Sequence, residues 1–166
     1  KGYVFKSDTD SEVLMYLIED VYNNGLKGYT GTDKDPNWDD DDDKTLFKAI
    51  RIALNEVIGA YAIVVLDQAN PNELYAARKG SPLVIGVGNS EYFVASDASP
   101  IIEYTDKVIY LEENEVAKIN KDQEVVIKTI NNKTKNPYIQ KLEQTLESIE
   151  KGGFDHFMLK EIFEQP

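Results

Sequence analysis

The side chain with the clearest capacity to bind a ligand is Asp10, within the run Thr9-Asp10-Ser11-Glu12. This run predicts a capping box at a helix start, in which Thr9 accepts from the amide of Glu12 and Glu12 reaches back. An acid in a first helical turn is stabilising by about 0.3–1 kcal/mol through the helix dipole. A carboxylate at a strand-to-helix junction can instead accept hydrogen bonds from a ligand ammonium group. The residues alone leave both interpretations of Asp10 open.

The other residue types that carry chemistry form no catalytic or metal-binding set. The sequence has no cysteine, which excludes a Cys nucleophile, a thiolate metal site and a disulfide framework within these residues. Ser81, Ser96 and Ser99 have no histidine at a recognisable spacing. We expect His156, the only histidine, to be a partly buried helix residue. We therefore predict no catalytic residue, no metal and no cofactor in this stretch.

Acidic residues dominate the surface chemistry. The run Asp39–Asp43 could in principle bind calcium, but adjacent carboxylates cannot all converge on one ion and the EF-hand spacing is absent. We expect a solvated loop that Trp38 docks onto the protein. A net charge of −12 argues against nucleic-acid partners. No apolar run approaches the roughly 20 residues of a membrane span, and no signal peptide is present, so we expect no membrane partner.

The hydrophobic pattern predicts helices at the beginning of the chain. Residues 1–6 alternate like the end of a strand. The first helix follows, with Val13, Leu14, Leu17, Ile18 and Val21 on one face and a stop at Asn23-Asn24-Gly25. A second helix, capped by Asp43, carries Leu46, Ile50, Ala53, Leu54 and Val57 and ends at Gly59.

Strands follow, and the chain closes on helices. The candidate strands are Ala60–Leu66, Glu73–Ala77, Leu83–Val87, Tyr92–Ala95, Lys107–Leu111, Glu115–Ile119 and Glu124–Ile130, with a helical turn at Ser99–Tyr104. Because Ala60–Leu66 is apolar on both faces, we expect it to be covered on both sides. A stripe of Ile139, Leu142, Leu146 and Ile149 and the segment His156–Phe163 predict two more helices. This order indicates an α+β fold with helices packed on an antiparallel sheet.

Four segments and the closing stretch resemble the glucosamine-6-phosphate synthase family, also called glutamine–fructose-6-phosphate aminotransferase. They are Phe5–Val13, Gly59–Tyr61 with the apolar strand after it, Ala77–Gly86, Phe93–Asp97 and His156–Pro166. The resemblance runs almost end to end, and the acidic loop is its weakest part. It implies the four-layer αββα sandwich of the N-terminal-nucleophile hydrolases, here incomplete at its N-terminus. Residues 1–152 would then be the C-terminal portion of a glutaminase domain, and residues 153–166 the junction to an absent sugar isomerase domain.

The resemblance also implies a reaction. Family enzymes take ammonia from glutamine and deliver it to fructose 6-phosphate, which is the first step of hexosamine and UDP-GlcNAc synthesis. An N-terminal Cys attacks the amide with its own α-amino group as base, and an Asn side chain and a Gly amide form the oxyanion hole. These groups would precede Lys1, so a lone chain should be inactive. Asp10 matches the family's T-D-x-E aspartate, which implies that it binds the glutamine α-ammonium group.

The same resemblance sets the expected partners and compartment. We expect a cytoplasmic enzyme part, a homo-oligomer as the full-length protein, and a missing N-terminal segment that supplies strands to both sheets. Since the chain lacks an initiator Met, we expect it to start inside a longer protein. Two alternatives remain: a non-catalytic amidotransferase-like module, and the glutaminase domain of another class II amidotransferase. The ending Glu161-Ile162-Phe163-Glu164-Gln165-Pro166 argues against the latter.

Overall fold

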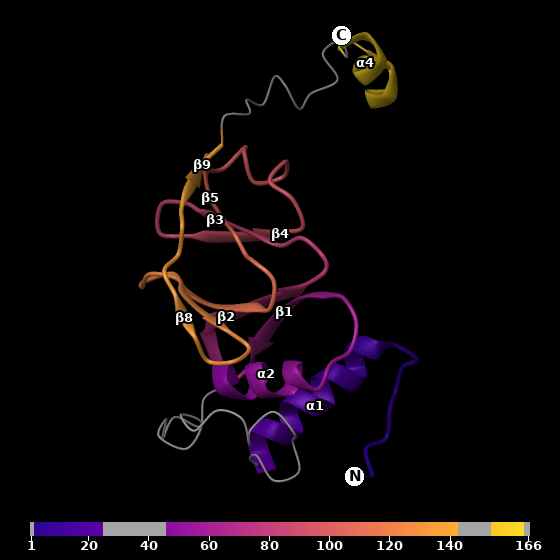
Figure 1. The fold of residues 1–166 in the computed structure, drawn as a ribbon, viewed down its shortest axis with the longest axis vertical. Coiled ribbons are helices and arrows are strands. Elements are labelled where there is room, and N and C mark those ends of the chain that lie inside the picture. The colour runs from indigo at the N-terminus through magenta and orange to yellow at the C-terminus, as the bar shows by residue number, and fades with distance from the viewer. Residues whose placement is uncertain (1, 25–45, 143–153, 165–166) are drawn as a thin grey trace.

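The computed structural model describes residues 2–24, 46–142 and 154–164, and these form two antiparallel sheets with helices (Figure 1). The helices are α1 (Asp10–Asn24), α2 (Leu46–Asn55) and α4 (Phe157–Glu164). The strands are β1 (Tyr61–Asp67), β2 (Asn70–Lys79), β3 (Val84–Val87), β4 (Tyr92–Ala95), β5 (Lys107–Tyr110), β6 (Glu115–Asn120), β7 (Val126–Thr129), β8 (Thr134–Lys135) and β9 (Gln140–Lys141). The α+β class predicted from the sequence is confirmed.

Each sheet has its own strand order. The first sheet runs β1-β2-β6-β7-β8 and the second runs β4-β3-β5-β9. Every pairing between these strands is antiparallel. In Figure 1, α1 and α2 lie against the first sheet, and the second sheet lies on its other side. The described residues thus build three successive layers of one α+β sandwich.

The helices share a hydrophobic core with one face of the first sheet. Ile50 and Leu54 of α2 are completely or almost completely buried there, together with Tyr75 of β2 and Val116 of β6. The α1 side chains Ile18 and Val21 join the same core, whereas Val13, which the pattern placed on this face, is 52% exposed. α1 therefore reaches its position by packing on α2 rather than by helix propensity alone.

A second core lies between the two sheets. At its centre Ala76 of β2 is paired with Ala117 of β6, and both are 0% exposed. Ile85 of β3 and Ile109 of β5 face them from the second sheet. Small side chains on the first sheet and branched ones on the second allow the close interdigitation that protein interiors require.

The structure overturns two predictions about the ends of the chain. No strand forms at residues 2–6, where Tyr3 and Phe5 instead pack their rings on Tyr16 of α1. The helix predicted from Ile139 does not begin there, because Gln140–Lys141 forms β9 beside β5. The rest of that stripe, the acidic run and Trp38 lie outside the described residues.

The prediction that the Ala60–Leu66 strand is covered on both sides is also wrong for the described residues. Ile63 and Val65 of β1 pack toward the helices, but Val64 and Leu66 on the opposite face are 48% and 69% exposed. β1 is the edge strand of the first sheet, beyond the part that the second sheet covers. Its sequence thus has the apolar character of an interior strand at an edge position.

Gly86 tests how tightly the outer face of the second sheet is packed. A Cβ atom added there would lie 2.5 Å from Cγ2 of Ile101 and 3.2 Å from Cγ2 of Thr105. We predict that Gly86→Ala lowers the free energy of unfolding by about 1–3 kcal/mol, because the substitution overpacks a filled site. Urea denaturation measures it, with the exposed Asn72→Ala as control. Equal midpoints for both variants and the wild type would disprove this packing.

Candidate functional site

Asp10 is the first residue of α1, and its side chain is exposed. Among the described residues its carboxylate accepts no hydrogen bond, so both oxygens remain available to a ligand. It lies at the N-terminal end of α1, where the helix dipole is positive. The structure therefore fits either a helix-stabilising acid or an acceptor for a ligand cation.

The segment before Asp10 is held by Glu12 from within the first helical turn. The carboxylate of Glu12 accepts hydrogen bonds from the amides of Lys6 at 2.9 Å and Ser7 at 2.7 Å, and from the Ser7 hydroxyl at 2.5 Å. The Ser7 hydroxyl, followed by the Lys6 amide, holds the pKa of Glu12 below its ordinary value. The predicted capping box between Thr9 and Glu12 is therefore not formed among the described residues: Glu12 does reach back, but to Lys6 and Ser7, and the Thr9 side chain contacts Ser7 instead.

Aromatic contacts fix the chain further upstream. The rings of Tyr3 and Tyr16 lie 4.7 Å apart, and those of Phe5 and Tyr16 lie 5.5 Å apart. The Tyr3 hydroxyl donates to the Asp20 carboxylate at 3.0 Å. Residues 3–9 are therefore held against α1. The path of the main chain is thus fixed both before and after Asp10.

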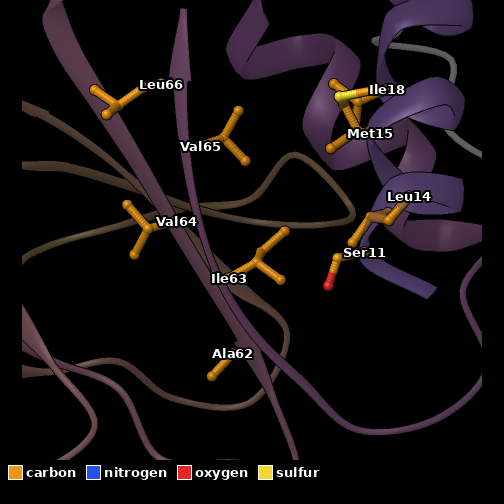
Figure 2. A pocket seen from close by; sticks show the side chains of 9 residues that line it. All are labelled: Ser11, Leu14, Met15, Ile18, Ala62, Ile63, Val64, Val65 and Leu66. Carbon is orange, nitrogen blue, oxygen red and sulfur yellow. The ribbon is translucent and has the colours of Figure 1, made fainter. Parts of the chain in front are cut away.

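A groove opens beside Asp10, between α1 and the edge strand β1 (Figure 2). Its volume is about 430 Å³. The side chains that line it are Ser11, Leu14, Met15 and Ile18 of α1 and Ala62, Ile63, Val64, Val65 and Leu66 of β1. Figure 2 shows Ile63 and Val65 directed toward the helix and Val64 and Leu66 directed away from it.

The groove is apolar, and one of its walls is a sheet edge. Ser11, the neighbour of Asp10, is the only hydroxyl-bearing residue in the lining. Along β1, the outer main-chain N–H and C=O groups face no partner strand among the described residues. An apolar groove along a free edge suits an added β-strand better than a small polar molecule. Asp10 itself is not among the residues that line this groove, although its neighbour Ser11 is.

A second polar cluster shapes the turn after β2, within the Ala77–Gly86 segment. The carboxylate of Glu113 accepts from the Gly80 amide at 3.0 Å and from Nη2 of Arg78 at 2.6 Å. Gly80 has φ +72°, and a Cβ atom there would lie 2.8 Å from Cβ of Ala60, so only glycine fits. The Gly80 amide and then the Arg78 guanidinium hold the pKa of Glu113 below its ordinary value.

The remaining candidates do not gather into a site. No group of three or more His, Asp or Glu side chains that could hold a metal is found among the described residues. His156 is exposed and directly precedes α4, so its predicted partial burial is wrong. No helix in the described residues is long and apolar enough to cross a membrane. Sequence reasoning missed Glu113 as a turn anchor, because its partner Gly80 lies 33 residues away.

Comparison with known proteins finds relatives that match this chain along its whole length. A relative from Bacteroides thetaiotaomicron is 52% identical over 166 residues, which is 100% of this chain and 24% of the relative. Relatives from Chlorobaculum tepidum and Pyrococcus horikoshii are 49% and 42% identical, also over the whole chain. All three are named glutamine–fructose-6-phosphate aminotransferase [isomerizing]. The chain is homologous throughout to these aminotransferases.

The match covers the whole of this chain but only part of each relative. The chain spans about a quarter of the length of these aminotransferases. No family model matches it. The match covers Asp10, the groove and the Glu113 turn alike, since all lie within the aligned 166 residues.

The Glu113 turn gives a pH-dependent prediction. Because the pKa of Glu113 is lower in the folded state, its stabilisation is present above the unfolded pKa and is lost as pH falls through the folded pKa. We predict that Glu113→Gln lowers the melting temperature at pH 7, and that this difference shrinks between about pH 4.5 and pH 3. Thermal unfolding across this range measures the difference, with the exposed Glu103→Gln as control. A difference between the Glu113 variant and the wild type that is constant from pH 7 to pH 3 would contradict the role.

Proposed function

We propose that these residues are part of an enzyme that makes glucosamine 6-phosphate from fructose 6-phosphate and glutamine. Residues 1–152 would form the C-terminal portion of its glutaminase domain, and residues 153–166 the junction to its isomerase domain. The observation that carries the proposal is the homology over the whole chain to enzymes named for this reaction. The absence of cysteine fits a cytoplasmic enzyme, since no disulfide calls for an oxidising compartment.

Within this enzyme, Asp10 would bind the α-ammonium group of glutamine. Its exposure, its free carboxylate oxygens and its place at a firmly held helix start support that role. A charge-assisted hydrogen bond to an ammonium group contributes about 1.5–3 kcal/mol. The cysteine nucleophile would come from other residues of the enzyme, because these 166 contain no cysteine. The 166 residues by themselves would therefore bind or position substrate without hydrolysing it.

The proposed fold is the four-layer αββα sandwich of the N-terminal-nucleophile hydrolases. Two features support the proposal that other segments complete it. The edge strand β1 has an apolar groove beside it, and Val64 and Leu66 are exposed on its other face. A strand from the rest of the enzyme would pair with the free edge of β1 and extend the first sheet.

The helix α4 supports the junction assignment. Met158, Ile162 and Phe163 are 73%, 64% and 71% exposed, an apolar face that isolated soluble domains rarely present. Phe163 stacks on Phe154 with ring centroids 5.9 Å apart, which stiffens the segment. In Figure 1, α4 lies apart from both sheets. A neighbouring domain of the same enzyme would bury this face.

The assignment of Asp10 is tested in the full-length enzyme. We predict that Asp10→Asn lowers kcat/KM for glutamine by about 10- to 100-fold, because the substrate ammonium loses its ionic acceptor. The KM for fructose 6-phosphate should not change. Steady-state kinetics measure both, with Asp8→Asn as control, since Asp8 is an exposed acid of the same segment. Glutamine kinetics that are equal for the two variants and the wild type would refute the assignment.

The open edge gives a prediction for the isolated chain. We expect the 166 residues to self-associate with increasing concentration, because apolar edge strands pair with other chains. Val64→Lys combined with Leu66→Lys should reduce this association, whereas Tyr138→Lys, at a residue that is also exposed but lies away from the groove, should not. Sedimentation velocity distinguishes these outcomes. A compact wild-type monomer at all concentrations would contradict the open edge.

A further inference from the structure

Both oxygens of the Glu12 carboxylate accept hydrogen bonds from neighbouring residues of the chain. Oε1 accepts from the Lys6 amide at 2.9 Å, and Oε2 accepts from the Ser7 amide at 2.7 Å and the Ser7 hydroxyl at 2.5 Å. The Ser7 oxygen also lies 2.9 Å from the Thr9 hydroxyl and accepts from the Thr9 amide at 3.4 Å. One side chain in the first turn of α1 thus organises the four residues that immediately precede Asp10.

Asp10 and Glu12 therefore differ in their hydrogen bonds, although both are acids of the same helical turn. The Asp10 carboxylate accepts no hydrogen bond among the described residues, whereas both oxygens of Glu12 are occupied. Glu12 cannot accept from a ligand without giving up contacts that hold residues 6–9. We call the Glu12 contacts to Lys6 and Ser7 the clamp, because they hold residues 6–9 against α1. The carboxylate that stays available to a ligand is that of Asp10.

The clamp matters because Asp10 is at the junction of two segments. From Asp10 onward the main chain is fixed by α1. Residues 6–9 are held by the hydrogen bonds of Lys6 and Ser7 to Glu12, and the residues before them by the Tyr3–Asp20 hydrogen bond and the aromatic contacts to Tyr16. Without the clamp, this segment would have to be ordered when the substrate binds, at a cost in conformational entropy. A small displacement of a binding group also reduces its interaction with a substrate.

We propose that Glu12 is a positioning residue for glutamine binding: it holds residues 6–9 against α1 so that the Asp10 carboxylate is presented to the substrate ammonium. This inference rests on the function proposed above. Glu12 acts through Asp10 and contacts no substrate atom. A Gln side chain at position 12 could not replace Glu12. Its amide NH₂ would face an N–H or O–H donor where Glu12 presents a carboxylate oxygen.

The test is a double-mutant cycle in the full-length enzyme with Asp10→Asn, Glu12→Gln and the double variant. We predict that Glu12→Gln raises the KM for glutamine by roughly tenfold, with kcat within about twofold and the KM for fructose 6-phosphate unchanged. In the Asp10→Asn background the same substitution should have no further effect, because the group that it positions is already lost. Asp8→Asn is the matched control for charge, since it removes a nearby negative charge and leaves the clamp intact.

A second measurement does not depend on activity. Hydrogen exchange of the Lys6 and Ser7 amides should become faster in Glu12→Gln and stay unchanged in Asp10→Asn, because these amides donate to Glu12. If Asp10→Asn weakens glutamine binding and Glu12→Gln does not, the positioning role is wrong and the proposed function stands. If neither variant changes glutamine kinetics, the assignment of Asp10 itself fails. Additive effects in the double variant would also overturn the inference.

Discussion

The packing of α2 on the first sheet is the interaction on which the rest of this structure depends. Ile50 and Ala53 are 0% exposed where they meet Tyr75 and Val116, and Arg51 of the same helix is 1% exposed. Arg51 donates to the side chain of Asn132, which connects the helix to the β7–β8 hairpin. α1 packs on α2, so the helix start that carries Asp10 is positioned through this core.

Two acids in the first turn of α1 make different contacts. Glu12 turns back into the protein and orders the preceding residues, while Asp10 faces outward with free oxygens. Beside them, an apolar groove follows the edge of β1 and is shaped for a strand rather than for a polar ligand. An exposed acid next to an uncovered sheet edge fits the proposed site, to which other residues of the enzyme would contribute. The chain spans about a quarter of the length of its relatives.

Features that depend on a local sequence pattern could be predicted, whereas features that depend on residues far apart in the chain could not. The strands β1–β7 follow from alternation, apolar runs and turn residues, and the start of α1 near Asp10 follows from the helical spacing of the apolar residues after it. The binding role of Asp10 comes from the family resemblance alone and stays a prediction. β8 and β9 have two residues each, too few for a periodic signal. The exposure of Val64 depends on which strands lie beside β1, which its own sequence does not encode. Glu113 and Gly80 meet only because β2 and β6 pair.

The most direct test of this account is a crystal structure of the full-length enzyme with glutamate, the product of glutamine hydrolysis, bound in its glutaminase site. The account predicts that an oxygen of the Asp10 carboxylate lies within about 3.2 Å of the glutamate α-ammonium nitrogen, with the Glu12 contacts to Lys6 and Ser7 intact. It also predicts a strand from another part of the enzyme paired with the outer edge of β1. A glutamate whose ammonium group is held by other residues, with Asp10 facing solvent, would contradict it.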